Sequence, residues 1–326
     1  MVHPRPAARP QAPPADQPAA RCGELFSGPR ELFRRARGRT GGVKPLCSLD
    51  GRILPLAEAR IDPQDRGFLF GDSLYEGIKV LDGKILLLDL HLERLRSGLG
   101  RVDIPPPDDL ELRCHELVEA CGPDTGFLYL QVTRGVGPRS HVPPRDLTPT
   151  VLILPSAPVY DPPAGRPRRA VTAPDWRWQH CDLKTNSLMA TVQGKLRMRD
   201  SDADEVLFVG PAGELREGGS TTLFVRRDDL LETHPLDGHI LPGITRRILL
   251  RLADERRLPV VERAPLVAER DSWQEAFLCG TLTGVQPLTV LDDDKVADGT
   301  VGSWTRDLAE DHAAFEKQLT GQEVPR

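Results

Sequence analysis

The chain has 326 residues, a length that allows about two domains. Its 43 basic and 48 acidic residues give a net charge of -5, which provides no general attraction to nucleic acid or an anionic membrane. No apolar run approaches the roughly 20 residues that a membrane span needs. The six cysteines lie far apart without a C-x-x-C pair, so neither a disulfide framework nor a metal site is expected. We expect a soluble, cytoplasmic protein that acts on small molecules.

Composition divides the chain into five parts. Residues 1–42 hold eight arginines, three acidic residues and seven prolines without helical or strand periodicity, which predicts a disordered leader. Two folded domains are expected at 43–156 and 168–310. A proline-rich stretch at 157–167 would link them, and 311–326 would form a C-terminal tail.

Helices and strands are interleaved along both expected domains. In chain order, apolar periodicity predicts strands at 77–81 and 84–88, helices at 90–99 and 110–121, strands at 127–133, 150–154 and 169–173, a helix at 187–199, strands at 205–209 and 222–226, a helix at 245–257, and strands at 260–264 and 275–279. Asp82-Gly83 between the first two strands is a strong hairpin signal. This interleaving predicts an α/β or α+β fold.

Four polar residues could carry chemistry, although none is diagnostic alone. Each also has an ordinary interpretation without a chemical role. Lys184 could be a solvated residue before a helix, Glu217 an exposed hairpin residue, and Arg94 a cation on a helix surface. Thr245 could simply cap the N-terminus of its helix. The alternative for Gly243 to Thr245 is an anion site, because N–H groups and the helix dipole favour negative charge at a helix start.

The order and spacing of these residues resemble one family, the class IV aminotransferases. The match consists of an N-terminal signature at Asp65–Glu76, the helix start His91–Leu95, and four later motifs at Asp182–Lys184, Glu217–Gly218, Leu241–Arg246 and Gly280–Thr283. The resemblance extends from about Cys47 to about Asp292. The ordered set is specific, whereas each motif alone would not be.

The resemblance implies a two-domain fold-type IV enzyme, with an N-terminal α/β sandwich and a C-terminal pseudo-barrel, that binds pyridoxal 5′-phosphate. It makes Lys184 the lysine that carries the cofactor and moves the substrate's α-proton, and Glu217 the carboxylate that faces the pyridine nitrogen. The phosphate and the remainder of the cofactor would be held by Arg94, Ser220, Thr221, Gly243, Ile244, Thr245 and Thr281.

Within the family, Gln131–His141 resembles the D-amino-acid transaminases. That likeness assigns the substrate's α-carboxylate to Tyr75, Arg139 and His141, on a loop that reaches across a homodimer interface, and the competing interpretation is a basic surface turn. The implied substrates are a D-amino acid such as D-alanine and a 2-oxo acid, 2-oxoglutarate or pyruvate.

Several alternatives remain open on the same scaffold. They are branched-chain aminotransferases, (R)-selective amine transaminases and aminodeoxychorismate lyase. A non-catalytic protein that only binds or carries the cofactor is disfavoured by the presence of both Lys184 and Glu217. Gly77 and Gly219–Thr222 depart from the family's usual residues, and Gly77 could enlarge the side-chain pocket.

Overall fold

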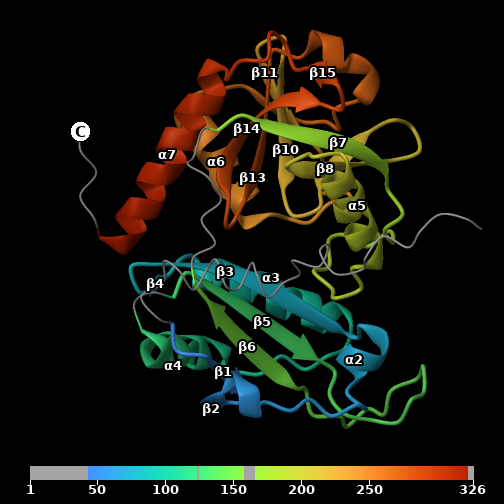
Figure 1. Ribbon diagram of the computed structural model, residues 1–326, viewed down its shortest axis with the longest axis vertical. Coiled ribbons are helices and arrows are strands. Elements are labelled where there is room, and N and C mark those ends of the chain that lie inside the picture. The colour runs from blue at the N-terminus through green and yellow to red at the C-terminus, as the bar shows by residue number, and fades with distance from the viewer. Residues whose placement is uncertain (1–42, 123–124, 158–165, 322–326) are drawn as a thin grey trace, which may run out of the picture. The chain divides into compact units, whose positions relative to one another are not determined.

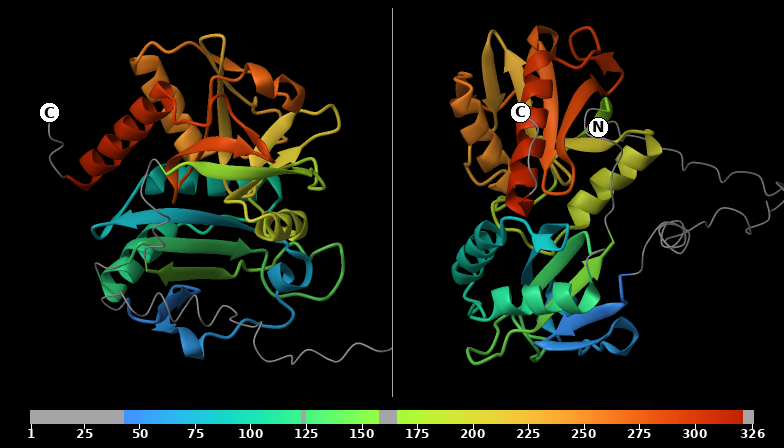
Figure 2. Two further views of the ribbon diagram at one scale, coloured as in Figure 1. Left: turned by 45° about the horizontal axis from the view of Figure 1, so that its top comes forward. Right: turned by 90° about the vertical axis from the view of Figure 1, so that its left-hand side faces the viewer.

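The computed structural model describes residues 43–122, 125–157 and 166–321, which belong to one compact unit. The expected leader and most of the expected linker lie outside the described residues. Two sheets organise the unit, one built from the N-terminal half and one from the C-terminal half (Figures 1 and 2). No helix within the described ranges is both long and apolar enough to cross a membrane.

The N-terminal sheet has six strands in the order β2-β1-β6-β5-β3-β4. The bounds of its strands in chain order are β1 Leu46–Leu49, β2 Arg52–Pro55, β3 Ser73–Leu81, β4 Lys84–Ile85, β5 Phe127–Thr133 and β6 Val151–Ser156. Helices α3 (Leu88–Arg101) and α4 (Leu110–Cys121) pack their leucines against one face of this sheet. The short elements η1 (Leu56–Glu58) and α2 (Arg66–Phe70) precede β3.

Alternation along β3 decides which of its side chains face the helices. Leu74, Glu76, Ile78 and Val80 are buried on the α3 side, and Tyr75 and Gly77 lie on the other face, as the period of two in a strand requires. The neighbouring strand β5 repeats the pattern, with Leu128, Leu130 and Val132 buried in the same core. The second face of this sheet is therefore free to line a site.

The C-terminal sheet has nine strands, eight of them in the order β12-β11-β10-β13-β14-β7-β8-β9, with β15 paired to β14. In chain order they are β7 Arg168–Pro174, β8 Glu205–Val209, β9 Leu215–Gly218, β10 Thr222–Arg227, β11 Leu230–Thr233, β12 Val260–Glu262, β13 Glu275–Gly280, β14 Gly284–Leu291 and β15 Asp294–Lys295. Strand β9 is the last strand of this order, and the chain passes from it directly into β10, which lies near the opposite end. The sheet therefore curves towards a barrel. Its interior is a core that includes Leu223, Val225 and Leu278.

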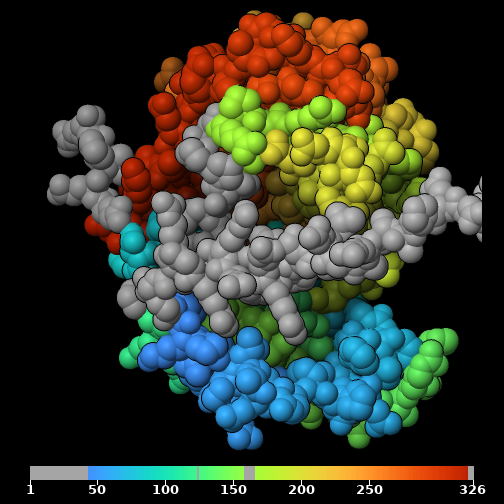
Figure 3. All heavy atoms as spheres, in the orientation of Figure 1, coloured from blue at the N-terminus to red at the C-terminus, as the bar shows by residue number. Residues whose placement is uncertain are grey.

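Three longer helices and one short helix accompany this sheet. They are α5 (Met189–Asp200), α6 (Ile244–Glu255), η2 (Val267–Ser272) and α7 (Ser303–Thr320). Helices α6 and α7 share a core with β10 and β13. In the space-filling view the yellow residues of α5 are seen on the same face as the blue residues near the start of the described chain (Figure 3).

Most expected elements are present, while β1, β2, α2, β9, β11, β14, β15 and α7 were not expected, and three further differences concern the expected segments. The hairpin at Asp82-Gly83 forms, but its second strand is only Lys84–Ile85 because α3 begins at Leu88 and takes the following leucines into the core. Helix α6 begins at Ile244 with Gly243 as N-cap, so Thr245 is not the cap. The expected C-terminal tail is wrong for 311–320, which belong to α7 and include the buried His312.

Candidate active site

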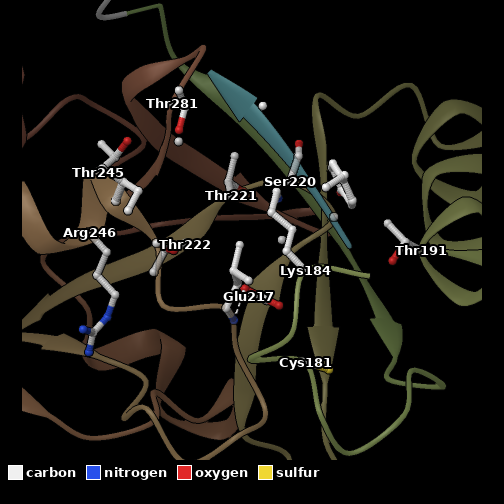
Figure 4. A pocket seen from close by; sticks show the side chains of 18 of the residues that line it. Cys181, Lys184, Thr191, Glu217, Ser220, Thr221, Thr222, Thr245, Arg246 and Thr281 are labelled. Atoms are coloured by element: carbon white, nitrogen blue, oxygen red, sulfur yellow. Dashed lines mark hydrogen bonds between the residues drawn. The ribbon is translucent and has the colours of Figure 1, made fainter. Parts of the chain in front are cut away.

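A cavity of about 330 Å³ lies where residues of the two sheets meet. The N-terminal half contributes Tyr75, Gly77, Arg94 and Phe127 to its lining. The C-terminal half contributes residues that flank α5, β9, β10, α6 and β13. Figure 4 shows Lys184 and Glu217 near its centre, with Thr245 and Thr281 together at one side. Ten of the twelve residues that the sequence nominated therefore line one cavity, which is large enough for a small molecule.

Lys184 is held by the backbone on either side of it. The N–H of Tyr75 donates to the Lys184 carbonyl at 2.9 Å, and Thr185 forms a bridge with Leu74, so β3 fixes the position of this segment. The Lys184 ammonium lies 4.6 Å from the centre of the Tyr75 ring. Burial lowers the pKa of Lys184 to about 8, the charge of Arg94 acts in the same direction, and Glu76 and Glu217 oppose it.

A prediction follows for the pH dependence of Lys184 reactivity. Its rate of reductive methylation by formaldehyde and cyanoborohydride in the apoprotein, measured by peptide mass spectrometry, should rise with pH through about 8 and level off above it, because only the neutral amine attacks. The exposed Lys317 is the internal reference. Since the pKa is lower than the usual 10.5, the amine's contribution to the free energy of unfolding should rise between pH 8 and 10.5. A Lys184 rate that levels off only near pH 10.5 would contradict the lowered pKa.

Glu217, in β9, is a buried carboxylate at the floor of the cavity. One oxygen accepts the Leu241 N–H at 3.0 Å, and the other accepts a hydrogen bond from Arg177. Burial raises the pKa of Glu217, while Arg177, the Leu241 N–H and Lys184 oppose that rise. A further cation placed in the cavity would favour the ionised carboxylate.

Arg177 was missed by the sequence interpretation. It also donates to both oxygens of Asp175, each at 2.9 Å, and its guanidinium lies over the Phe208 ring at 4.5 Å. Although burial acts in the other direction, Asp175 and Glu217 raise the pKa of Arg177, so the guanidinium stays charged. Asp175 accepts a further bond from Arg216 at 3.0 Å, so it is fully engaged. Nothing in the local sequence distinguishes Arg177 from other loop arginines.

Arg94 is fixed in place by a second buried carboxylate. Glu76 accepts two bonds of 2.7 Å from the Arg94 guanidinium, and its Oε2 also lies 2.7 Å from His91 Nδ1. Burial alone would raise the pKa of Glu76, but Arg94 and His91 lower it to about 2. The third Arg94 contact, 2.8 Å to the Pro242 carbonyl, brings the guanidinium to the start of α6.

The start of α6 forms one end of the cavity. Gly243, Ile244 and Thr245 all line it, together with Thr281 and Arg94. The unpaired N–H groups of a helix start and a nearby guanidinium suit a phosphate. With Lys184 and the carboxylate of Glu217 near the centre of the cavity, the donor set fits an elongated molecule whose anionic group lies at the start of α6 and whose cationic group faces Glu217.

Ser220 and Thr221 border the cavity, but their hydroxyls are directed elsewhere. Ser220 Oγ donates to Glu205 Oε2 at 3.2 Å, and Thr221 Oγ1 donates to the same oxygen at 3.0 Å. The hydroxyls are therefore not free donors for a bound molecule. The assignment of Ser220 and Thr221 as cofactor-binding residues remains a prediction. They could bind a cofactor through their backbone groups, or their hydroxyl oxygens could accept a hydrogen bond from it.

Arg139 and His141 do not line the cavity of their own chain. They lie on the exposed loop after β5, where Arg139 is 5.6 Å from the Phe70 ring centre and the His141 ring packs against Phe70 at 5.8 Å. Arg66 donates to the Ser140 carbonyl at 2.7 Å and so anchors the loop. Of the three residues expected at the substrate carboxylate, the described chain brings only Tyr75 to the cavity.

Gly77 does not simply enlarge the cavity. A Cβ at this position would lie 2.9 Å from the Phe127 ring, so the ring of Phe127 occupies the space that a side chain at 77 would take. Gly77 and Phe127 both line the cavity, and the Phe127 ring forms the wall of the cavity at this point.

A second cavity, of about 550 Å³, adjoins the first and shares Tyr75, Arg94 and Lys184 with it. Charged residues on its lining pair with one another, Arg101 with Asp182 at 2.5 Å and Arg246 with Glu262 at 2.8 Å. We assign the chemistry to the smaller cavity because it alone includes Glu217 and Thr281.

The cavity thus combines a lysine of lowered pKa, a buried carboxylate and a helix start beside an arginine, groups that would suit a phosphorylated molecule. The model of the amino-transferase class IV family matches residues 73–291. A D-alanine aminotransferase of Bacillus licheniformis is 33% identical over 269 residues, which are 79% of this chain and 93% of that protein. A D-alanine aminotransferase of Staphylococcus aureus (strain COL) is 31% identical, over 85% of this chain and 98% of that protein. The chain belongs to the class IV aminotransferase family.

Solved structures agree on the fold. A branched-chain amino acid aminotransferase of Escherichia coli superposes with a TM-score of 0.75 at 21% identity, covering 87% of this chain and 97% of that one. A 4-amino-4-deoxychorismate lyase of Pseudomonas aeruginosa superposes with a TM-score of 0.72 at 29% identity, covering 83% of this chain and 99% of that one. The expected α/β fold of fold type IV is confirmed.

Proposed function

We propose that this protein is a pyridoxal-phosphate-dependent transaminase that moves the amino group of a D-amino acid to a 2-oxo acid. With D-alanine and 2-oxoglutarate the products would be pyruvate and D-glutamate. The observation that carries the proposal is the placement of Lys184 and Glu217 in one cavity whose far end is formed by Arg94 and the start of α6. The similarity to two D-alanine aminotransferases supports the choice of substrate.

The residues present fit the cofactor. Arg94, Ile244, Thr245 and Thr281 would hold its phosphate, Glu217 its ring nitrogen, and Lys184 its aldehyde carbon. When bound, the cofactor supplies an electron sink that disperses the charge left at Cα after proton loss.

The chain's own residues perform the proton chemistry. Lys184 Nζ, neutral above pH about 8, can take the proton from the substrate Cα and would deliver it to the carbon by which the cofactor is attached to the amino nitrogen. The Tyr75 ring beside Nζ and the bridge between Leu74 and Thr185 limit where the amine can move. Glu217 would stabilise positive charge beside it in the cavity, and the hydrogen bond from Arg177 holds the carboxylate in this position.

The substrate carboxylate requires a partner in this proposal. Arg139 and His141 lie on an exposed loop outside the cavity of their own chain, so we propose a homodimer in which this loop completes the partner's site. An arginine offers a bidentate fork to a carboxylate, and a histidine adds a directional donor. We further propose that the protein acts in the cytoplasm, where the five cysteines of the described residues, all buried and free, would stay reduced.

The test is a half-reaction with single amino donors. The cofactor-loaded protein should convert D-alanine and D-glutamate to their 2-oxo acids and should be inactive with L-alanine, L-glutamate, L-leucine and (R)-1-phenylethylamine. Arg139→Ala should lower kcat/KM for D-alanine, with a loss of transition-state stabilisation of about 2–5 kcal/mol, because the substrate's carboxylate would lose its charged partner. Chiral chromatography and the cofactor's absorbance follow the reaction.

Each competing function has its own signature in that assay. Turnover of L-leucine but of no D-amino acid would place the protein with the branched-chain enzymes. Reaction with the aromatic amine alone would mean that Arg139 and His141 are ordinary surface residues. Pyruvate released from aminodeoxychorismate without an acceptor would indicate the lyase, to whose structure the chain is 29% identical.

A further inference from the structure

Behind the cavity lies an ion pair between a buried carboxylate and a partly exposed lysine, to which the proposed mechanism gives no role. Glu205, the first residue of β8, is 4% exposed and Lys195 of α5 donates to its Oε1. Neither residue lines the cavity. The same carboxylate accepts the hydroxyls of Ser220 and Thr221 and the N–H of Val206, so four donors converge on one buried charge.

Both hydroxyl donors belong to the segment 218–222, which joins β9 to β10. All five residues of this segment line the cavity, and it begins directly after Glu217. The Gly219 N–H donates to the Val206 carbonyl of β8 at 3.1 Å and fastens the segment from behind, and the Gly218 N–H closes a turn within the segment by donating to the Thr221 carbonyl at 2.7 Å. The segment is thus a wall of the cavity whose outer side rests on Glu205.

The two glycines permit this close approach. A Cβ on Gly218 would lie 2.1 Å from Thr221 Oγ1 and 3.1 Å from the Glu205 carboxyl carbon. A Cβ on Gly219 would lie 2.5 Å from Lys195 Cε. Neither glycine has a positive φ, so space and not backbone conformation requires them. The departure of Gly219 from the family's usual residue therefore has a local explanation in the stem of Lys195.

We infer that Lys195 and Glu205 are positioning residues that hold the segment 218–222 in the shape that accepts the cofactor. The inference rests on the proposed function, because it takes the cavity as the pyridoxal phosphate site. The Glu205 carboxylate binds Ser220 and Thr221 from behind, and this fixes the wall next to Glu217. Lys195 compensates the buried charge of Glu205, which would otherwise be costly in this place.

The experiment measures the dissociation constant of pyridoxal 5′-phosphate by titrating the apoprotein, and the melting temperature of the apoprotein beside it. Glu205→Gln keeps the shape of the side chain and removes its charge, so it should weaken cofactor binding about tenfold or more. Lys195→Met should do the same, and Lys195→Arg, which retains the charge, should bind within about twofold of the wild type.

A matched control separates positioning from stability. Glu275 is also buried, and it accepts bonds from Arg226 and from the N–H and hydroxyl of Thr305, but it does not line the cavity. Glu275→Gln should lower the melting temperature of the apoprotein and leave the cofactor's dissociation constant within about twofold. If Glu275→Gln weakens the cofactor as much as Glu205→Gln does, the effect is one of stability and the inference is wrong.

A double variant can replace the Glu205 and Lys195 variants if these do not fold. Ser220→Ala combined with Thr221→Val removes two bonds to Glu205 and leaves the ion pair intact, and about tenfold weaker cofactor binding is again expected. An unchanged dissociation constant in this double variant, or in a folded Glu205→Gln, overturns the inference. A wild-type protein that binds no pyridoxal phosphate instead overturns the proposed function, so the two failures are distinct.

Discussion

Replacing Lys184 by alanine is expected to abolish transamination, with kcat falling by a factor on the order of 10⁴ or more, because the chain loses both the amine that carries the cofactor and its proton carrier. The lowered pKa of about 8 leaves a larger share of this amine neutral and reactive near neutral pH than an ordinary lysine would have. Borohydride reduction of the wild type followed by peptide mass spectrometry should find the pyridoxyl group on Lys184. In Lys184→Ala no such adduct should form in the cavity.

The chain offers a natural control in Lys195, the other lysine close to the cavity. Its ammonium is engaged by Glu205 and lies 3.3 Å from Ser220 Oγ, so it is held away from the cavity. A pyridoxyl group found on Lys195 in the reduced wild-type protein would refute the assignment of Lys184. The melting temperature of Lys184→Ala should stay close to that of the wild-type apoprotein, since the change removes a desolvated amine.

Replacing Glu217 by glutamine should leave the cofactor bound and slow the removal of the α-proton by a factor of about 10²–10³, because the charge that stabilises the electron sink is lost. The amide of glutamine can still accept the Leu241 N–H, which now lies 3.0 Å from Glu217 Oε2, so the local backbone should be retained. Single-turnover absorbance with D-alanine measures the step directly, and the deuterium isotope effect at Cα should increase as the step becomes limiting.

Arg177 provides a second variant on the same carboxylate. Arg177→Met removes the cation that opposes the rise of the pKa of Glu217, so the carboxyl should be protonated over a wider pH range and activity should fall most at low pH. Raising the pH should recover part of the activity in Arg177→Met and none in Glu217→Gln. Single-turnover rates equal to the wild type in Glu217→Gln would remove Glu217 from the site.

The sequence by itself determined the parts of this protein that depend on short-range pattern. Strand and helix periodicity placed α4, β5 and β8 at their observed bounds, since apolar side chains recur at the spacing of each element. The ordered motifs nominated Lys184, Glu217, Arg94 and the start of α6, and the structure brings all of them to one cavity. Each of these residues is marked by its own neighbours in the chain.

Contacts between distant segments were decided only by the tertiary structure. Arg177 reaches Glu217 across 40 residues, Glu205 reaches Ser220 across 15, and Arg94 reaches Glu76 across 18. Sheet register and helix docking create these pairs, and a carboxylate's role depends on which donors surround it once it is buried. The loop of Arg139 and His141 shows the same limit, because the fold and not the motif places both residues outside their own chain's cavity. Sequence spacing identifies a side chain, whereas only packing fixes its partners, its charge and the direction in which it points.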